Sequence, residues 1–257
     1  MSSPTVVTGD KGKRGGQMSF PVGPDEMLDL ISEMQVVDLT QVVEEGMPVY
    51  PTHPQFFHMK WHTGDPASMY QLLISEHAGT HLDCPSHFYP DRDDPRRVSL
   101  ETFPVEACIG PAVKLDFKGL DGSVELGGED IRKWEQAHEP LRPGQAAVFS
   151  FGWERLWEKL PQGKAYLESW PGITREAASY LVERGVRLAG TDCLGIDGSA
   201  TKDLGAHFAL LENRTLIVEN LRGLEALPPK FLLLTLPLKI RDGTGSPIRA
   251  VAMFVPG

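Results

Sequence analysis

The chain has 257 residues, 41% of them hydrophobic, and a formal net charge of −10. This is the composition of an ordinary globular protein with one sizeable core or at most two small domains. The acidic charge argues against a nucleic-acid partner, which needs a basic face. No run approaches the ~18 apolar residues of a membrane span, so no membrane partner is expected. The three cysteines are too few and too scattered for a disulfide framework, and we expect a reduced, cytoplasmic protein.

The N-terminal part divides by composition. Residues 1–22 are rich in Ser, Gly and Lys and predict a disordered arm, whereas residues 23–257 predict a single domain. Pro24-Asp25-Glu26 predicts the start of a helix, whose apolar face runs from Met27 to Ile31. Residues 36–39 predict the first strand.

Residues 46–51 form a loop bounded by prolines, which keep it extended and rigid. The loop carries Tyr50, which either packs in the core or lines a site. His53, His58 and His62 follow at irregular spacing, and we interpret them as surface residues or neighbours of a metal site rather than a second metal cluster. Residues 70–75 predict a strand that leads into the next motif.

The stretch His77-Ala-Gly-Thr-His81-Leu-Asp83-Cys-Pro-Ser-His87 concentrates imidazole and carboxylate, the usual ligands of Zn²⁺ and Mn²⁺. A straight strand would separate His77 and His81 by about 13 Å. One metal needs both nitrogens at about 2.1 Å. The chain must therefore fold back, and Gly79 permits the bend. Isolated histidines are often surface residues, but so dense a group favours a metal site. The zincin pattern H-E-x-x-H is absent.

The middle of the chain predicts strands at 113–117 and 146–151, the second of them buried on both faces. A helix is predicted after 126–130, and the mixed-charge run 91–97 predicts a solvated loop. Three tryptophans follow in a Gly- and Pro-interrupted segment, at positions 153, 157 and 170. Such long loops often cover active sites, although core packing explains these aromatics equally well.

Thr174 predicts the N-cap of a helix over 174–182, and Gly185 its end. A strand over 187–192 then leads to Asp192 and Asp197, which either support a metal site from outside or only fix the turn. A short helix over 206–213 precedes a strand over 215–221. Glu219 stands among aliphatic residues of that strand, where a carboxylate is costly unless it is paired or binds a metal.

The chain closes with strands at 231–236 and 250–255, separated by the loop 243–249. Strands that alternate with short helices, with several strands in succession, predict an α/β fold with a mixed central sheet and flanking helices. A phosphate-binding loop is not indicated, because no Gly-Lys-Ser/Thr follows the glycines. The G-x-S-x-G elbow of serine esterases is also missing.

The stretch from His77 to His87 resembles H-x-G-T-H-x-D-x-P-x-H, the signature of the cyclase family of metal-dependent hydrolases, at every fixed position. The resemblance covers most of residues 36–255 and includes Gly190-Thr191-Asp192, Ile196-Asp197 and the segment 243–249. Bacterial kynurenine formamidases and isatin hydrolases belong to this family. The resemblance implies a swivelling β/β/α-like fold and a homodimer or homotetramer.

The resemblance also implies roles for individual residues. The first metal would be bound by His77, His81 and Asp83, and the second by Asp83, His207 and Glu219, with Asp83 and Glu219 bridging. The cofactor would be Zn²⁺, two per chain, or Mn²⁺. His87 would be the catalytic proton shuttle, with a role as a third ligand as the alternative. Tyr50 would line the substrate site, where the family's formamidases typically have Trp.

The implied reaction is arylformamidase activity, the hydrolysis of N-formyl-L-kynurenine to L-kynurenine and formate in tryptophan catabolism. The pair His207 and Glu219 favours this type over the isatin hydrolases, which resemble a one-metal design. The residues alone indicate only hydrolysis of an amide, formamide or small lactam, whereas the resemblance implies a small aromatic amide as the substrate. The alternatives are an isatin hydrolase, another cyclic amide or lactone hydrolase or a cyclase, and a non-catalytic metal-binding protein. Ligands of the His and carboxylate type, with a spare histidine, favour an open catalytic site over a closed structural one.

Overall fold

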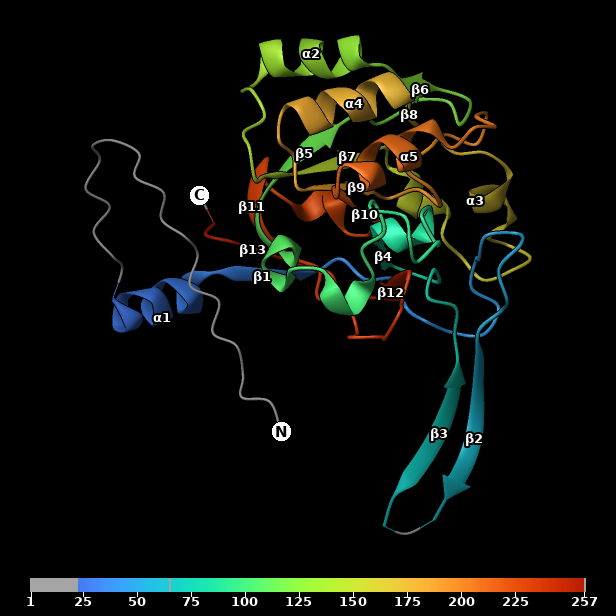
Figure 1. Ribbon diagram of the computed structural model, residues 1–257. Coiled ribbons are helices and arrows are strands. Elements are labelled where there is room, and N and C mark those ends of the chain that lie inside the picture. Colours follow the sequence, from blue (N-terminus) through green and yellow to red (C-terminus); the bar gives the residue numbers. More distant parts are fainter. Residues whose placement is uncertain (1–22, 65, 257) are drawn as a thin grey trace. The chain divides into compact units, whose positions relative to one another are not determined.

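The computed structural model describes residues 23–64 and 66–256 (Figure 1). The predicted disordered arm at residues 1–22 lies outside the described residues. The chain separates into two units, Met1–Met34 and Gln35–Gly257. The first unit contains helix α1 (Pro24–Glu33), which begins at the predicted proline and carries Asp25 and Glu26 in its first turn. The predicted domain start at residue 23 stays a prediction.

The second unit is built on a nine-stranded mixed sheet with the strand order β1-β13-β11-β5-β7-β9-β10-β4-β12. The strands are, in that order, β1 (Gln35–Asp38), β13 (Val251–Phe254), β11 (Lys230–Leu234), β5 (Ile109–Asp116), β7 (Ala146–Ser150), β9 (Leu188–Thr191), β10 (Leu216–Glu219), β4 (His81–Asp83) and β12 (Gly245–Pro247). The strands from β5 to β10 run parallel, and the outer pairs are antiparallel. The predicted mixed α/β fold is confirmed.

Three helices cover one face of this sheet: α2 (Gly128–Ala137), α4 (Arg175–Glu183) and α5 (Gly205–Glu212) (Figure 1). Their apolar residues, such as Ile131 and Leu181, pack with Phe149 of β7 in one core cluster. Val148, the neighbouring residue, packs in a second cluster on the opposite face. Successive side chains of a strand point to opposite faces, so β7 is buried on both, as its continuous apolar run predicted.

The predicted boundaries hold best where a capping residue marks them. Thr174 is the N-cap of α4, and its hydroxyl accepts a hydrogen bond from the backbone N–H of Ala177. Gly185 follows that helix with a φ of +73°. This unit also contains the short helix α3 (Lys164–Glu168), the paired strands β6 (Glu125–Leu126) and β8 (Gly172–Ile173), and 3-10 turns. No helix of the described residues is long and apolar enough to cross a membrane.

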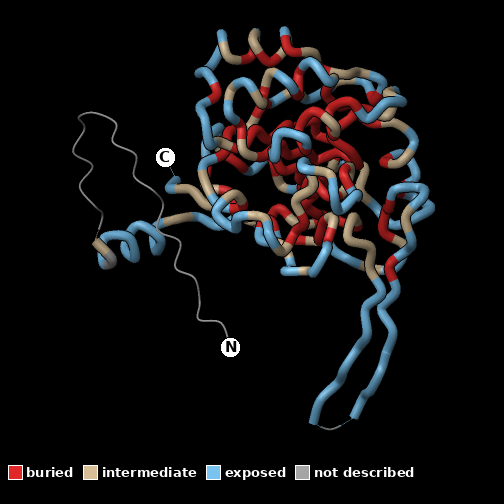
Figure 2. Tube along the Cα trace, in the orientation of Figure 1, coloured by how far each residue is buried: buried red, intermediate tan, exposed pale blue. Residues whose placement is uncertain are grey.

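Strands β2 (Phe57–Thr63) and β3 (Ser68–Leu73) form a separate antiparallel ribbon that projects from the body of this unit (Figure 1). Every residue of the two strands is exposed (Figure 2). We call this element the β2–β3 hairpin. Residues 70–75 predicted its second strand, whereas its first strand was not predicted. The hairpin lies between Tyr50 and His77 in the sequence, so its base is continuous with two segments that carry predicted site residues.

Candidate metal centre

Two adjacent strands carry the predicted carboxylates. Strand β4 pairs antiparallel with β10, which places Glu219 opposite His81 and Ile217 opposite Asp83. Alternate residues of a strand point to the same face, so His81, Asp83 and Glu219 share one side of the sheet. The chain folds back before β4 at Gly79, whose φ is +64°, as the sequence predicted.

On the other side of β4, strand β12 approaches the site closely. A Cβ added at Gly245 would lie 2.5 Å from Cε1 of His77 and 2.7 Å from the carbonyl oxygen of Leu82. Only glycine fits at this position, because real Cβ atoms do not approach other heavy atoms so closely. The loop before β12 can therefore reach His77.

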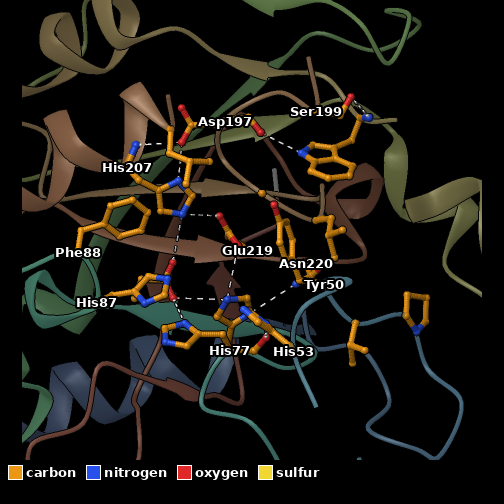
Figure 3. A pocket seen from close by; sticks show the side chains of 18 of the residues that line it. Tyr50, His53, His77, His87, Phe88, Asp197, Ser199, His207, Glu219 and Asn220 are labelled. Atoms are coloured by element: carbon orange, nitrogen blue, oxygen red, sulfur yellow. Dashed lines mark hydrogen bonds and ion pairs between the residues drawn. The ribbon is translucent and has the colours of Figure 1, made fainter. Parts of the chain in front are cut away.

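Helix α5 brings His207 to the same place. Asp197, from the loop after β9, accepts hydrogen bonds from the backbone N–H groups of Ala206 and His207 at 2.7 and 3.0 Å. These donors lie in the first turn of α5, where backbone N–H groups lack partners within the helix. The carboxylate of Asp197 thus anchors the first turn of α5 and holds His207 at the site (Figure 3).

Asp83 and Glu219 each lie between His81 and His207. Nε2 of His81 is 3.4 Å from Oδ1 of Asp83 and 3.5 Å from Oε2 of Glu219. Nε2 of His207 is 3.6 Å from Oδ2 of Asp83 and 3.3 Å from Oε1 of Glu219. Nδ1 of His77 lies 2.6 Å from Oδ1 of Asp83. Each carboxylate therefore presents one oxygen to each histidine, an arrangement suited to two bridged cations.

The charge balance of the site fits a metal. Asp83 is buried, and its Oδ2 has no hydrogen-bond partner among the described residues. An unpaired buried carboxylate oxygen is costly unless a cation compensates it. His81, Asp83 and Glu219 also offer ligand atoms that all lie within 4.8 Å of one another. The residues present therefore fit a divalent cation of the Zn²⁺ or Mn²⁺ type.

The second ring nitrogen of each predicted histidine ligand is hydrogen-bonded. Nδ1 of His81 donates to the carbonyl oxygen of Gly79 at 2.9 Å, and Nδ1 of His207 donates to Asp197 at 2.5 Å. Nε2 of His77 lies 2.8 Å from the hydroxyl of Thr244. These contacts leave one nitrogen of each ring directed at the carboxylates.

His87 differs from the other histidines of the site. It ends the 3-10 turn Pro85–His87 and stacks on His77, with 3.8 Å between the ring centroids (Figure 3). It also lies in a group with His77 and Asp83 whose ligand atoms are within 4.8 Å of one another. Neither of its ring nitrogens has a hydrogen-bond partner in the described part of the chain. Burial lowers the pKa of His87 to about 3, so the ring is neutral at pH 7.

In the other titratable groups of the site, neighbouring opposite charges shift the pKa values in favour of the charged forms. Burial disfavours the charge of Asp83, but His77 and His81 hold the pKa of its carboxyl well below the usual value. Burial also opposes protonation of His77 and His207. The pKa of His77 is nevertheless raised by Asp83, and that of His207 is raised well above its usual value by Asp197, Asp83 and Glu219. Without a metal, both rings therefore bind a proton more tightly than a free imidazole does.

A cavity of about 460 Å³ opens beside these residues. Its walls include Tyr50, Phe88 and Trp170. Tyr50 meets Trp170 edge to face at 6.4 Å, and Phe88 stacks on His207 at 4.8 Å (Figure 3). Tyr50 is 36% exposed, so it lies at the cavity wall rather than in the core. Such a cavity matches the size of ordinary small-molecule sites.

The structure brings together every residue predicted for the site. Of the three histidines at 53, 58 and 62, only His53 lines the cavity, and the other two lie on the β2–β3 hairpin. Phe88 and Thr244 were not predicted as residues of the site. Phe88 directly follows His87, and Thr244 lies in the segment 243–249 that resembles the family, so both positions carry a usable signal. The sequence allows Trp170 either to contact a substrate or to pack in the core, and the structure places it in the cavity wall.

Comparison with known proteins agrees with this site. Residues 37–198 match the family model described as "Putative cyclase". The chain is 28% identical over 228 residues to a kynurenine formamidase of Erythrobacter litoralis, covering 88% of this chain and 96% of that protein. It is 28% identical over 249 residues to an isatin hydrolase of Roseibium aggregatum, covering 87% and 93%. The crystal structure of an isatin hydrolase bound to the product analogue thioisatinate superposes with a TM-score of 0.82 at 26% identity, covering 91% of this chain and 100% of that chain.

Proposed function

The chain belongs to the cyclase family of metal-dependent hydrolases, and from this premise we propose that it hydrolyses the formamide of N-formyl-L-kynurenine, giving L-kynurenine and formate. The observation that carries the proposal is the placement of Asp83 and Glu219 between His81 and His207. A single metal would not require both carboxylates to face two histidines.

We assign each of the two metals a set of ligands that agrees with the family resemblance and with the contacts described above. His77, His81 and Asp83 would hold one metal, and Asp83, His207 and Glu219 the other, with Asp83 and Glu219 shared. Zn²⁺ is the expected ion and Mn²⁺ the alternative, because both accept imidazole and carboxylate. Bound there, the two ions would act as Lewis acids that activate a water and polarise the amide carbonyl.

The chain's own residues supply the remaining chemistry. His87 is neutral at pH 7 and can take the proton that the attacking water loses. The same ring can then give this proton to the arylamine as the C–N bond breaks, so that it ends the cycle neutral. The aromatic walls of Tyr50, Phe88 and Trp170 would enclose the aryl ring.

The test is a metal analysis and an assay of N-formyl-L-kynurenine hydrolysis on the same sample. We expect about two metals per chain, and turnover that a chelator abolishes and Zn²⁺ or Mn²⁺ restores. The similarity to the isatin hydrolase structure favours a second candidate, opening of a cyclic amide. One metal per chain, with isatin opened and the formamide left intact, would select that candidate. A protein that takes up no metal would contradict both.

We also propose that a second copy of the chain covers the β2–β3 hairpin. A two-stranded ribbon is marginally stable alone in water. Its large apolar side chains are 44% to 69% exposed: Phe57, Met59, Trp61, Met69, Tyr70, Leu72 and Leu73. At roughly 100 Å² each, they present on the order of 700 Å². A stable dimer needs about 800 Å² from each partner. Because apolar residues occupy both faces of the ribbon, a two-fold related copy that encloses the hairpin is the occupant we favour.

The cytoplasm is the compartment we propose. All three cysteines, Cys84, Cys108 and Cys193, are free and buried. Proteins of oxidising compartments more often use their cysteines in disulfides.

A further inference from the structure

We propose that two carboxylates outside the ligand set, Asp197 and Glu76, position the metal-binding histidines, each serving one of the two metal positions. The inference rests on the two-metal centre of the proposed function. Asp197 acts on His207 directly, and Glu76 acts on His77 through Thr244. Both are positioning residues, since neither is directed at the metals.

Asp197 fixes both the place and the tautomer of His207. Its Oδ2 accepts from Nδ1 of His207 at 2.5 Å and from the backbone N–H of the same residue at 3.0 Å. Its Oδ1 accepts from the N–H of Ala206 at 2.7 Å, and its carbonyl oxygen accepts from Nε1 of Trp170 at 2.9 Å. With the proton held on Nδ1, only Nε2 of His207 is free, and this atom faces Asp83 and Glu219.

Glu76 favours the opposite tautomer in His77, and it does so through the hydroxyl of Thr244, which lies between them. Oε2 of Glu76 accepts from the N–H of Thr244 at 2.9 Å and from its Oγ1 at 2.6 Å. The hydroxyl has one proton, which it donates in the hydrogen bond to Glu76. The Oγ1 atom must therefore accept from Nε2 of His77, at 2.8 Å. His77 then presents Nδ1 to the site, where Asp83 lies.

The contact of Asp197 with His207 and the contact of Glu76 with His77 through Thr244 are made by different parts of the chain. Asp197 belongs to the loop between β9 and α5, whereas Glu76 precedes the bend at Gly79 and Thr244 directly precedes β12. Asp197 and His77 lie on opposite sides of Glu219 (Figure 3). Nδ1 of His81 instead donates to the neutral backbone carbonyl of Gly79 and lies 3.4 Å from the side-chain amide nitrogen of Asn220. A carboxylate behind a ligating imidazole orients the ring and raises its basicity, and loss of such a partner costs about 10- to 100-fold in metal affinity.

The test uses one variant for each of these two contacts and measures metal binding. In Asp197→Asn, we expect the affinity of the His207 position to fall about 10- to 100-fold while the His77 position keeps its metal. In Thr244→Val, we expect the reverse, and Thr244→Ser should restore binding because it returns the hydroxyl. Each variant should retain about one metal per chain after dialysis against a weak chelator, where the wild type retains two.

Nitrogen NMR of the zinc-loaded, ¹⁵N-histidine-labelled protein tells the positions apart. We expect His77 to be metallated at Nδ1 and His81 and His207 at Nε2. The Nδ1-bound signal should persist in Asp197→Asn and disappear in Thr244→Val. This spectroscopic signature would not move if the two residues served only the stability of the fold.

Two matched controls each remove side-chain hydrogen bonds without touching a histidine. Ser199→Ala breaks the bonds of Ser199 to Trp170 and Gly122 in the loop of Asp197. Thr235→Val makes the same replacement as Thr244→Val at a buried threonine that bonds Cys108. Both controls should keep two metals. Equal loss of both metals in the two test variants, unchanged affinity, or His77 bound through Nε2 would overturn the inference. A wild type that binds two metals but does not cleave the formamide would contradict only the proposed substrate.

Discussion

Among the histidines of the site, His87 is the one whose ring nitrogens have no partner in the described residues, while His77, His81 and His207 each have one nitrogen held. A ligand needs a fixed ring, and a proton shuttle needs a free nitrogen. We therefore predict that His87→Ala keeps its metals and loses about 10²- to 10⁴-fold in kcat, the usual contribution of general acid–base catalysis. Metal analysis and steady-state kinetics on one preparation test this.

The exposed hairpin residue His58 provides the control, because His58→Ala removes an imidazole that does not line the cavity. Full activity in His87→Ala would contradict the shuttle role. Loss of a metal in the same variant would instead support the alternative in which His87 is a ligand.

Proton release on metal binding follows from the raised pKa values of His77 and His207. A metal must displace the proton from each ring that it binds. The metal-free protein should therefore release protons when Zn²⁺ is added at neutral pH. Its affinity should fall by about tenfold per pH unit for each proton displaced, as the pH is lowered below those pKa values. Titration of metal-free protein into a pH indicator, repeated at several pH values, measures both. An affinity that does not change with pH would contradict the assignment of these rings as ligands.

The cysteines should be unreactive in the folded protein. Burial raises the pKa of Cys84 and of Cys108 to about 11, and that of Cys193 well above its usual value. The thiolate is the reactive form, and at pH 8 it is a fraction on the order of 10⁻³ for a thiol of pKa 11. A thiol reagent should therefore label none of the three within minutes in the native state, and all three after denaturation. Rapid native labelling would mean that the protein opens locally at one of these sites.

At the scale of the element, our proposal that a second copy of the chain covers the β2–β3 hairpin can be tested by substitution. Trp61→Glu combined with Leu72→Glu places a charge on each face of the ribbon, where we propose that a second copy packs. Burying an unpaired charge is costly, so the variant should shift from dimer to monomer in light scattering at micromolar concentration. Val105→Glu changes another exposed apolar residue, 58% exposed and outside the hairpin, and should leave the mass unchanged. A dimer that survives the double substitution would place the interface elsewhere.

The sequence predicted the elements that carry a strong local pattern. The apolar run of β7, the Thr174 cap of α4 and the strand around Glu219 were all found. It did not predict β12, whose residues Gly-Ser-Pro have no strand pattern and are ordered by pairing with β4. Strand β2 was not predicted either, although Phe57, Met59 and Trp61 alternate with polar residues at the period of a strand.

For the whole molecule, the ligand types could be predicted, and Asp197 was one candidate support of a metal site, but the contacts of Glu76 and Thr244 could not be predicted. His77, His81, Asp83, His207 and Glu219 belong to residue types that suit a metal, and the family signature links them. Contacts such as that of Thr244 with His77 join residues 167 positions apart, and no local pattern records them. They follow from the strand order β10-β4-β12, which only the folded sheet defines.

Strand β4 (His81–Asp83) is short, and it pairs on both sides with strands that are distant in the sequence, β10 and β12. Sliding it by one residue would turn Leu82 to the site and send both His81 and Asp83 to the opposite face of the sheet. A bound metal would therefore favour correct folding, because it stabilises only the register of this short strand in which both ligands face the site. Refolding with Zn²⁺ present should then yield more correctly paired protein than refolding in chelator followed by late addition of the ion.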